Sequence, residues 1–208
     1  MPYHVMSPCT KTFGLHEGMK PVDFVDTMLS RLGYPVARWR APRVSRPPQG
    51  VEEHSRYGLL VSALRKGGCA MLVEALKMPG CDAVASNRTG HTLLHCAARL
   101  GDEAAVKLLL ERGANPAVSD DCGKTALHDA CWAVNLNKGI LRLLVDRDPN
   151  LLFATDRFRA TALDYCHASL QADFCRFFAH QQTTWWPPRD TKTKTCPANL
   201  DTGKLLHT

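Results

Sequence analysis

Two short stretches of the sequence bring together side chains of the kind that catalyse reactions or bind phosphate. The first, Gly123-Lys124-Thr125, resembles the end of a phosphate-binding loop, in which backbone amides and a lysine hold the phosphates of a nucleotide. That loop also needs a glycine five residues before Gly123, and position 118 is Val. The tripeptide therefore does not predict nucleotide binding.

The second stretch, His95-Cys96, places a base next to a thiol. Adjacent residues on a helix point about 100° apart, so the two side chains would not face each other. The same imidazole recurs as His128, which indicates a structural role that repeats along the chain. Neither H-E-x-x-H nor G-x-S-x-G occurs. We expect no enzymatic activity, no small-molecule substrate and no cofactor.

The nine cysteines do not predict a metal site or a disulfide framework. No C-x-x-C pair occurs, although zinc sites are typically built from two closely spaced ligand pairs. An odd number of cysteines behind an N-terminus that does not resemble a secretory signal favours reduced thiols. Most of them neighbour alanine or leucine, so we interpret them as small core residues.

The residues just discussed lie in segments that repeat along the chain. Thr92, Thr125 and Thr161 each open a similar segment, at intervals of 33 and 36 residues. Such a period indicates stacked units that cannot bury their apolar faces alone. A degenerate copy precedes them, because Gly68 and Gly80 lie 33 residues before Gly101 and Gly113. The aligned segments are 87–98, 120–131 and 156–167, each followed by a second apolar stretch at 104–110, 139–145 or 173–179.

The T-x-L-H-x-A cores at Thr92–Ala97 and Thr125–Ala130 resemble the ankyrin repeat. The resemblance implies an all-α solenoid of about four helix-turn-helix units. A narrower resemblance, to short ankyrin proteins of microalgae and related protists, is carried by 127–132, 148–153 and 162–165 and implies no particular activity. We expect a disordered 1–19, a helix and linker at 20–50, repeats at 51–86, 87–119, 120–155 and 156–180, and a polar, mostly disordered tail at 181–208.

The segments flanking the repeats leave alternatives open. Apolar residues at helical spacing predict a helix over Pro21–Leu32, ended by Gly33, that either caps the first repeat or docks in a partner's groove. Four prolines predict an extended linker over 35–50. The pair Trp185-Trp186 either folds back onto the last repeat or presents an aromatic anchor to a partner.

Two departures from the repeat pattern predict local differences. Arg159 stands where the other segments carry Gly90 and Gly123, and a residue with a side chain rarely adopts positive φ, so we expect a remodelled turn. The extra residues 133–137 should lengthen the loop between the two helices of the third unit.

In ankyrin proteins, partners usually contact the turn residues and exposed positions late in the first helices. The resemblance therefore implies a surface centred on Trp132, Phe158, Arg88 and Arg157, unless Trp132 instead packs under the 133–137 loop. The full set of implied contact residues is Arg88, Thr89, His91, Arg99, Asp121, Lys124, Trp132, Arg157 and Phe158.

Composition and charge narrow the function classes. Of 208 residues, 45% are hydrophobic and 22% charged, as in soluble globular proteins, and no apolar run is long enough for a membrane span. The net charge of +6 belongs to the flanking segments, because the positive and negative side chains of residues 51–180 are equal in number. Nucleic acid is thus an improbable partner, and the basic segment 38–46 is either a solvated linker or a nuclear-import or acidic-partner patch.

The sequence as a whole therefore predicts a non-catalytic protein–protein interaction module, an adaptor or scaffold, that binds a protein or peptide. We expect a cytoplasmic monomer. The alternative is a nuclear regulatory protein, such as a transcription coregulator, that uses the basic flanks.

Overall fold

The computed structural model describes residues 19–43, 51–133 and 137–187, and the statements below concern these residues. The disorder predicted for 1–19 and for most of 181–208 falls almost entirely outside them, as does the end of the predicted linker.

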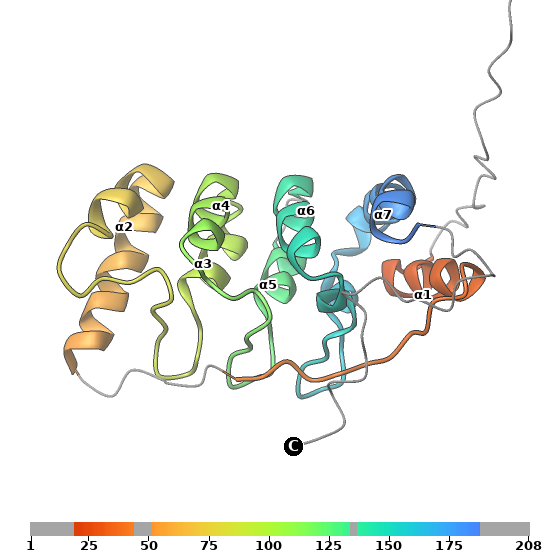
Figure 1. Ribbon diagram of the computed structural model, residues 1–208, viewed down its shortest axis with the longest axis horizontal. Helices are drawn as coiled ribbons and strands as arrows, with labels where there is room; N and C mark the ends of the chain where they lie inside the picture. Colours follow the sequence, from red (N-terminus) through yellow and green to blue (C-terminus); the bar gives the residue numbers. More distant parts are fainter. Residues whose placement is uncertain (1–18, 44–50, 134–136, 188–208) are drawn as a thin grey trace, which may run out of the picture.

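The described chain folds into helical hairpins stacked side by side, and this confirms the predicted all-α solenoid (Figure 1). The second part of α2, then α4, α6 and α7, forms one row of helices, with α3 and α5 beneath. Turns project from the hairpins on the side away from that row. The repeat helices are α2 (Val51–Ala75), α3 (Leu93–Leu100), α4 (Glu103–Glu111), α5 (Ala126–Trp132), α6 (Lys138–Arg147) and α7 (Gln171–Trp185).

Side chains at the predicted positions define where the short helices begin. The Thr92 hydroxyl accepts from the His95 amide at the start of α3, and Asp102 accepts from the Ala105 amide at the start of α4. Gly101 ends α3 with φ of 75°, a left-handed conformation that glycine adopts without strain. Two residues therefore suffice to reverse the chain between α3 and α4.

The core lies between the stacked hairpins. Leu93, Ala97, Val106 and Leu109 are fully buried, and Ala97 is small enough to let the first helices approach closely as α3 packs against α5. Fully burying a valine or leucine side chain stabilises the fold by about 1.5–3 kcal/mol. Since each unit contributes several such residues, the stability of a unit depends on its neighbours.

The prediction of a remodelled turn at Arg159 is wrong. Arg159 adopts φ of 65°, close to the 74° of Gly90 and the 79° of Gly123. The turn is otherwise the same, because the Arg159 amide donates to the Asp156 carbonyl as the Gly123 amide donates to that of Asp120. A Cβ on Gly123 would come within 3.0 Å of the Asp156 Cα in the next turn. No further turn stacks on Arg159 in the described chain, so its Cβ is tolerated there.

The loop of the third unit is longer, as predicted. Five residues, 133–137, separate α5 from α6, whereas two separate α3 from α4. Of these, residues 134–136 are not among those that the structure describes. Asn137 caps α6 by accepting from the Ile140 amide, and its Nδ2 donates to the Gly101 carbonyl. The longer loop is thereby attached to the preceding repeat.

The first and last repeats deviate in different ways. In the first, two helices run into each other at Gly67-Gly68, where Gly68 has positive φ like its counterpart Gly101. In the last, the expected first helix shrinks to one 3-10 turn, η2 (Ala162–Tyr165), with Asp164 in place of histidine. The repeat histidine bonds to the following turn, and the last repeat has none.

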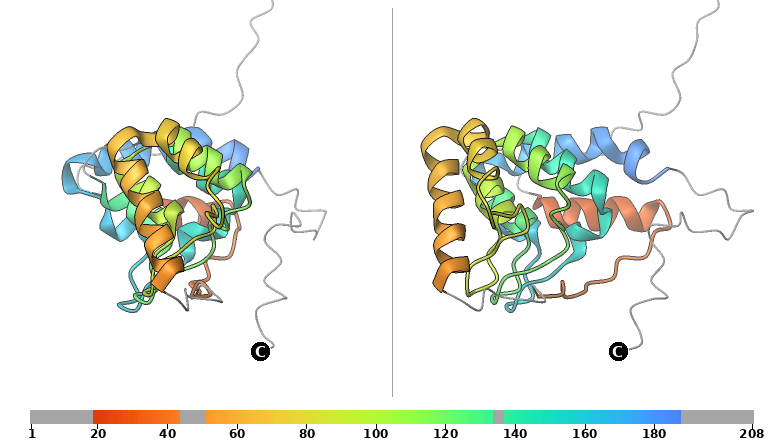
Figure 2. Two further views of the ribbon diagram at one scale, coloured as in Figure 1. Left: turned by 90° about the vertical axis from the view of Figure 1, so that its left-hand side faces the viewer. Right: turned by 60° about the vertical axis from the view of Figure 1, so that its left-hand side comes forward.

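The N-terminal helix docks on the opposite end of the solenoid from the one predicted. Helix α1 (Pro21–Arg31) packs against α7 and η2 of the last repeat, not against the first (Figures 1 and 2). Its buried face includes Phe24, Val25, Met28 and Leu29. It lies at the level of α3 and α5, so it covers the apolar end where a further repeat would stack.

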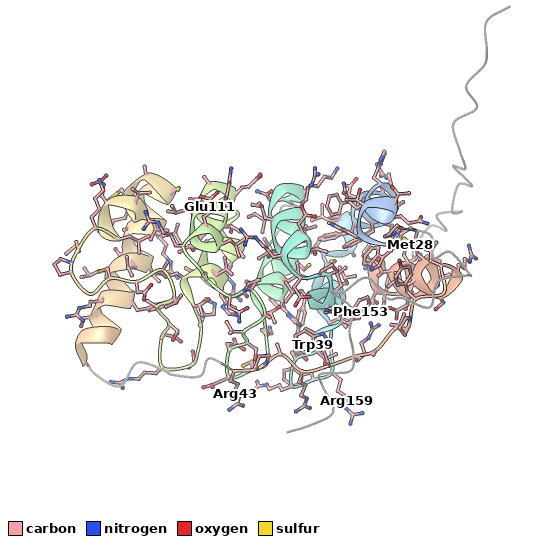
Figure 3. All side chains as sticks on the ribbon, in the orientation of Figure 1. Met28, Trp39, Arg43, Glu111, Phe153 and Arg159 are labelled. Carbon is pink, nitrogen blue, oxygen red and sulfur yellow. The ribbon has the colours of Figure 1, made fainter. Side chains whose placement is uncertain are left out.

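Residues 34–43, which we call the strap, return from α1 along the turns toward the middle of the solenoid (Figure 1). The Thr155 amide donates to the Trp39 carbonyl at 2.7 Å, and the Ser119 amide donates to the Pro42 carbonyl at 2.8 Å. The Trp39 indole donates to the Asn150 carbonyl, near Phe153 (Figure 3). This part of the predicted linker is extended, but it is bound to the repeats along its length.

The pair Trp185-Trp186 folds back onto the repeats, which was the first of the two alternatives in the sequence analysis. Helix α7 runs to Trp185, five residues past the expected end of the repeats at 180. Trp185 and Trp186 are buried, and the Trp185 indole donates to the Asp146 carboxylate at 2.6 Å. These rings are therefore part of the core and not a free anchor.

Candidate functional site

The turns that carry the predicted contact residues are joined into a row. The Asp121 amide donates to the Thr89 carbonyl at 2.8 Å, and the Arg157 amide donates to the Cys122 carbonyl at 2.9 Å. Within each turn one side-chain oxygen, from Asn87, Asp120 or Asp156, accepts from two backbone amides. The row is thus rigidly built, and it holds Arg88, Asp121 and Arg157 at exposed positions.

Lys124, Trp132 and Tyr165 form a cluster next to this row. The Lys124 ammonium lies 4.3 Å from the centre of the Tyr165 ring and 5.1 Å from that of Trp132, and the two rings are 5.5 Å apart. Trp132 is 56% exposed. The alternative that it packs under the 133–137 loop involves residues 134–136, which lie outside the described residues. The Tyr165 hydroxyl donates to Asp156, which fixes the ring. Sequence reasoning missed Tyr165, because only the fold places it beside Trp132.

His91 and Arg99 meet at a buried carboxylate that sequence reasoning also missed. Asp129 accepts from His91 Nε2 at 3.1 Å and from Arg99 at 2.7 Å, with only 3% of its side chain exposed. The other His91 nitrogen then accepts from the Tyr57 hydroxyl. Burial alone would raise the pKa of Asp129, but the His91 hydrogen bond and the nearby positive charges lower it below its usual value. The sequence did offer one signal for this buried carboxylate, because an aspartate stands inside the otherwise apolar helix 126–132.

The remaining predicted residues lie apart from these two clusters. Phe158 is 68% exposed at the tip of the last turn, with the Arg157 guanidinium 4.7 Å from its ring centre. Arg88 and Thr89 are exposed at the tip of the first turn of the row. Arg43 of the strap reaches the Asp121 carboxylate at 3.9 Å and its carbonyl at 3.3 Å. The predicted set therefore forms a continuous row and not one compact site.

The His95-Cys96 pair is built into the fold. His95 Nε2 donates to the Lys124 carbonyl at 2.9 Å, while Nδ1 accepts from the Thr92 amide. Burial lowers the pKa of His95, and burial raises the pKa of the Cys96 thiol. A thiol with raised pKa is a poor nucleophile, and this imidazole has no nitrogen left to activate it.

A groove of about 430 Å³ lies at the first repeat, lined by a stripe of α2 that includes Tyr57, Val61 and Arg65, and by Asn87. Within the described ranges, no three His, Cys, Asp or Glu side chains gather closely enough to hold a metal ion. No helix found in those ranges combines the length and the hydropathy needed to span a membrane. Among the described cysteines, those at 96, 131, 166 and 175 are buried, as expected for core residues, whereas those at 69, 81 and 122 are half-buried.

A comparison with known protein families finds a match for part of the stacked repeats. A family described as ankyrin repeats, in three copies, matches residues 59–153. This part of the chain is similar to ankyrin repeats. Ankyrin repeats are generally protein–protein interaction modules, and catalysis is not typical of them. No curated protein matches the chain, so the narrower resemblance to short ankyrin proteins of microalgae and related protists stays a prediction.

The repeat histidines His95 and His128 should make the stability of the fold depend on pH. Burial lowers the pKa of His95 and of His128 below the ordinary 6.5, so the folded state favours the neutral rings. Their contribution is fully present above pH 6.5 and is lost as the pH falls below it, because the unfolded chain then binds more protons. We expect the urea midpoint to fall between pH 7.5 and 5.5.

The double variant His95→Gln with His128→Gln is the control for this prediction. It should be less stable at pH 7.5, and its midpoint should change less across the same range. A wild-type midpoint that stays constant or rises toward pH 5.5 would contradict this role of the two rings.

Proposed function

We propose that the chain is a non-catalytic protein–protein interaction module, an adaptor or scaffold, which binds a protein or peptide along its row of turns and first helices. The observation that supports this most is the exposed Trp132, held between Lys124 and Tyr165. Exposed aromatic side chains of this kind are the residues that dominate binding energy at protein interfaces.

The surface is also organised before any partner arrives. Tyr165 is fixed by Asp156, and Arg99 is held by Asp129, so these side chains lose little freedom on binding. Preorganisation lowers the entropic cost of association, about 0.5–1.5 kcal/mol for each immobilised flexible side chain. Phe158 at the last turn extends the aromatic surface.

The alternative of a nuclear regulator has less support from the described residues. Arg38 pairs with Asp26 of α1, and Arg43 pairs with Asp121 of a repeat turn, so both arginines contact other parts of the described chain. We propose a cytoplasmic location for the chain. A fluorescent fusion that accumulates in the nucleus would favour the alternative.

Replacing Trp132 by Ala tests the proposed function. We expect capture of the chain's protein partners from a cell extract to fall at least about tenfold, because truncating an interface anchor costs 2 kcal/mol or more, roughly a 30-fold change in affinity. Met78→Ala is the matched control, since Met78 is similarly exposed, at 51%, but lies outside the row of turns. Unchanged capture by the Trp132 variant would show that the surface is placed wrongly.

A further inference from the structure

The charges along the row of turns are arranged asymmetrically. The carboxylates of Asp120 and Asp156 face inward, where they accept backbone amides of their own turns. Asp129 is buried between His91 and Arg99. Asp121 is 56% exposed and is paired with Arg43 of the strap. The carboxylates of Asp120, Asp129 and Asp156 are thus already bound by the protein itself, whereas those of Asp121 and Asp164 remain exposed.

The positive groups of the same face point toward solvent. Arg65, Arg88 and Arg157 are exposed, and 52% of the Arg99 side chain is exposed although one nitrogen bonds to Asp129. Lys124 is held above two aromatic rings. These cations extend from the groove on α2 to the last turn, with Trp132 and Phe158 at the end of the row.

We propose that this face binds an extended acidic segment of a protein that carries an aromatic or aliphatic side chain among its carboxylates; this rests on the proposed function. Arg65, Arg99 and Lys124 pair with carboxylates of the segment, and its apolar side chain packs on Trp132 and Phe158. Opposite charges placed in this way set both the orientation of the segment and its rate of association.

A protein segment fits this face better than a nucleic acid, which is also an anion that stacks on aromatic rings. Asp121 and Asp164 remain exposed among the cations and would repel a uniformly charged phosphate backbone. A peptide can place an uncharged residue opposite each of them. The strap also shows that an extended peptide can bind these turns through its backbone, as at Ser119 and Thr155.

Fluorescence anisotropy on the full chain tests the proposal with three labelled probes. The first is a twelve-residue peptide with six Asp or Glu residues around a central Leu-Phe pair. The second replaces the acidic residues by Lys, and the third is single-stranded oligothymidine of equal charge. We expect the acidic peptide alone to bind, with an affinity that falls as NaCl is raised.

The double variant Lys124→Glu with Arg157→Glu should weaken binding of the acidic peptide at least about tenfold. Lys107→Glu with Lys138→Glu changes the net charge equally on α4 and α6 and should leave the affinity within about twofold. Equal loss in both variants, no loss in the first, no binding of the acidic peptide, or tighter binding of oligothymidine would each overturn the proposal.

The proposed function fails separately from this inference. If partner capture depends on Trp132 while the acidic peptide does not bind, the chain is an interaction module whose partner has another chemistry. If capture does not depend on Trp132, the surface itself is wrong, whatever the peptide does.

Discussion

Replacing Met28 by Asp should detach α1 from the last repeat and lower the free energy of unfolding by about 3–5 kcal/mol. Met28 has no exposed surface and lies on the face of α1 that packs against α7 (Figure 3). An aspartate there either stays buried without a partner or drives the helix off the solenoid. Urea unfolding followed by tryptophan fluorescence measures the change.

Thr27→Asp is the matched control, because Thr27 is exposed on the same helix. It should change the free energy of unfolding by no more than about 0.5 kcal/mol. If the Met28 variant is equally stable, α1 does not cap the last repeat, and Phe174, Phe178 and Trp186 must be covered in some other way.

The docking of α1 also ties the N-terminal segment to the later repeats. Helix α1 covers the last repeat, and the strap runs back past Thr155 to Ser119 in the middle of the solenoid. Repeat proteins often lose their terminal units first, because those units have one neighbour only. Here the last repeat has a second neighbour supplied by the N-terminal segment, so it should unfold together with the middle repeats.

Single substitutions at two equivalent turn positions, 123 and 159, should change the free energy of unfolding in opposite directions. Gly123→Ala should cost about 2–4 kcal/mol, because alanine is strained at φ of 79° and its Cβ would press on the backbone of the next turn. Arg159→Gly should stabilise the fold by about 0.5–1 kcal/mol, since it relieves strain at φ of 65° and loses only part of that gain to unfolded-chain entropy.

The two variants are compared by urea unfolding at one pH. Similar destabilisation in both would mean that the turn at Arg159 differs from the others after all. A neutral Gly123→Ala variant would show that the stacked turns are looser than the 3.0 Å approach to Asp156 indicates.

The repeat architecture could be predicted from the sequence because its causes are local. Thr92 and Asp102 cap helices within their own repeat, and Gly101 ends a helix by its own backbone conformation. The position of α1 could not be predicted, because an amphipathic helix does not specify which apolar end it covers. The 17 residues from 34 to 50 could span up to about 60 Å, so they could reach either end.

The contact positions were inferred from the resemblance, and the fold keeps Trp132, Phe158 and Arg157 exposed. Their partners within the chain could not be inferred in the same way. Tyr165 lies beside Lys124 and Trp132 only because the last repeat stacks on the third. Asp129 accepts hydrogen bonds from Arg99 and His91, which precede it in the sequence by 30 and 38 positions. Sequence patterns carry little information over such separations.

Amide hydrogen exchange on the full chain bound to a captured partner tests the central claim most directly. We predict slower exchange on binding in the turns at 88–91, 121–124 and 157–160 and at the ends of α3 and α5. Protection confined to the outer helices α4 and α6, with the turns unchanged, would contradict the claim that the row of turns and first helices binds the partner.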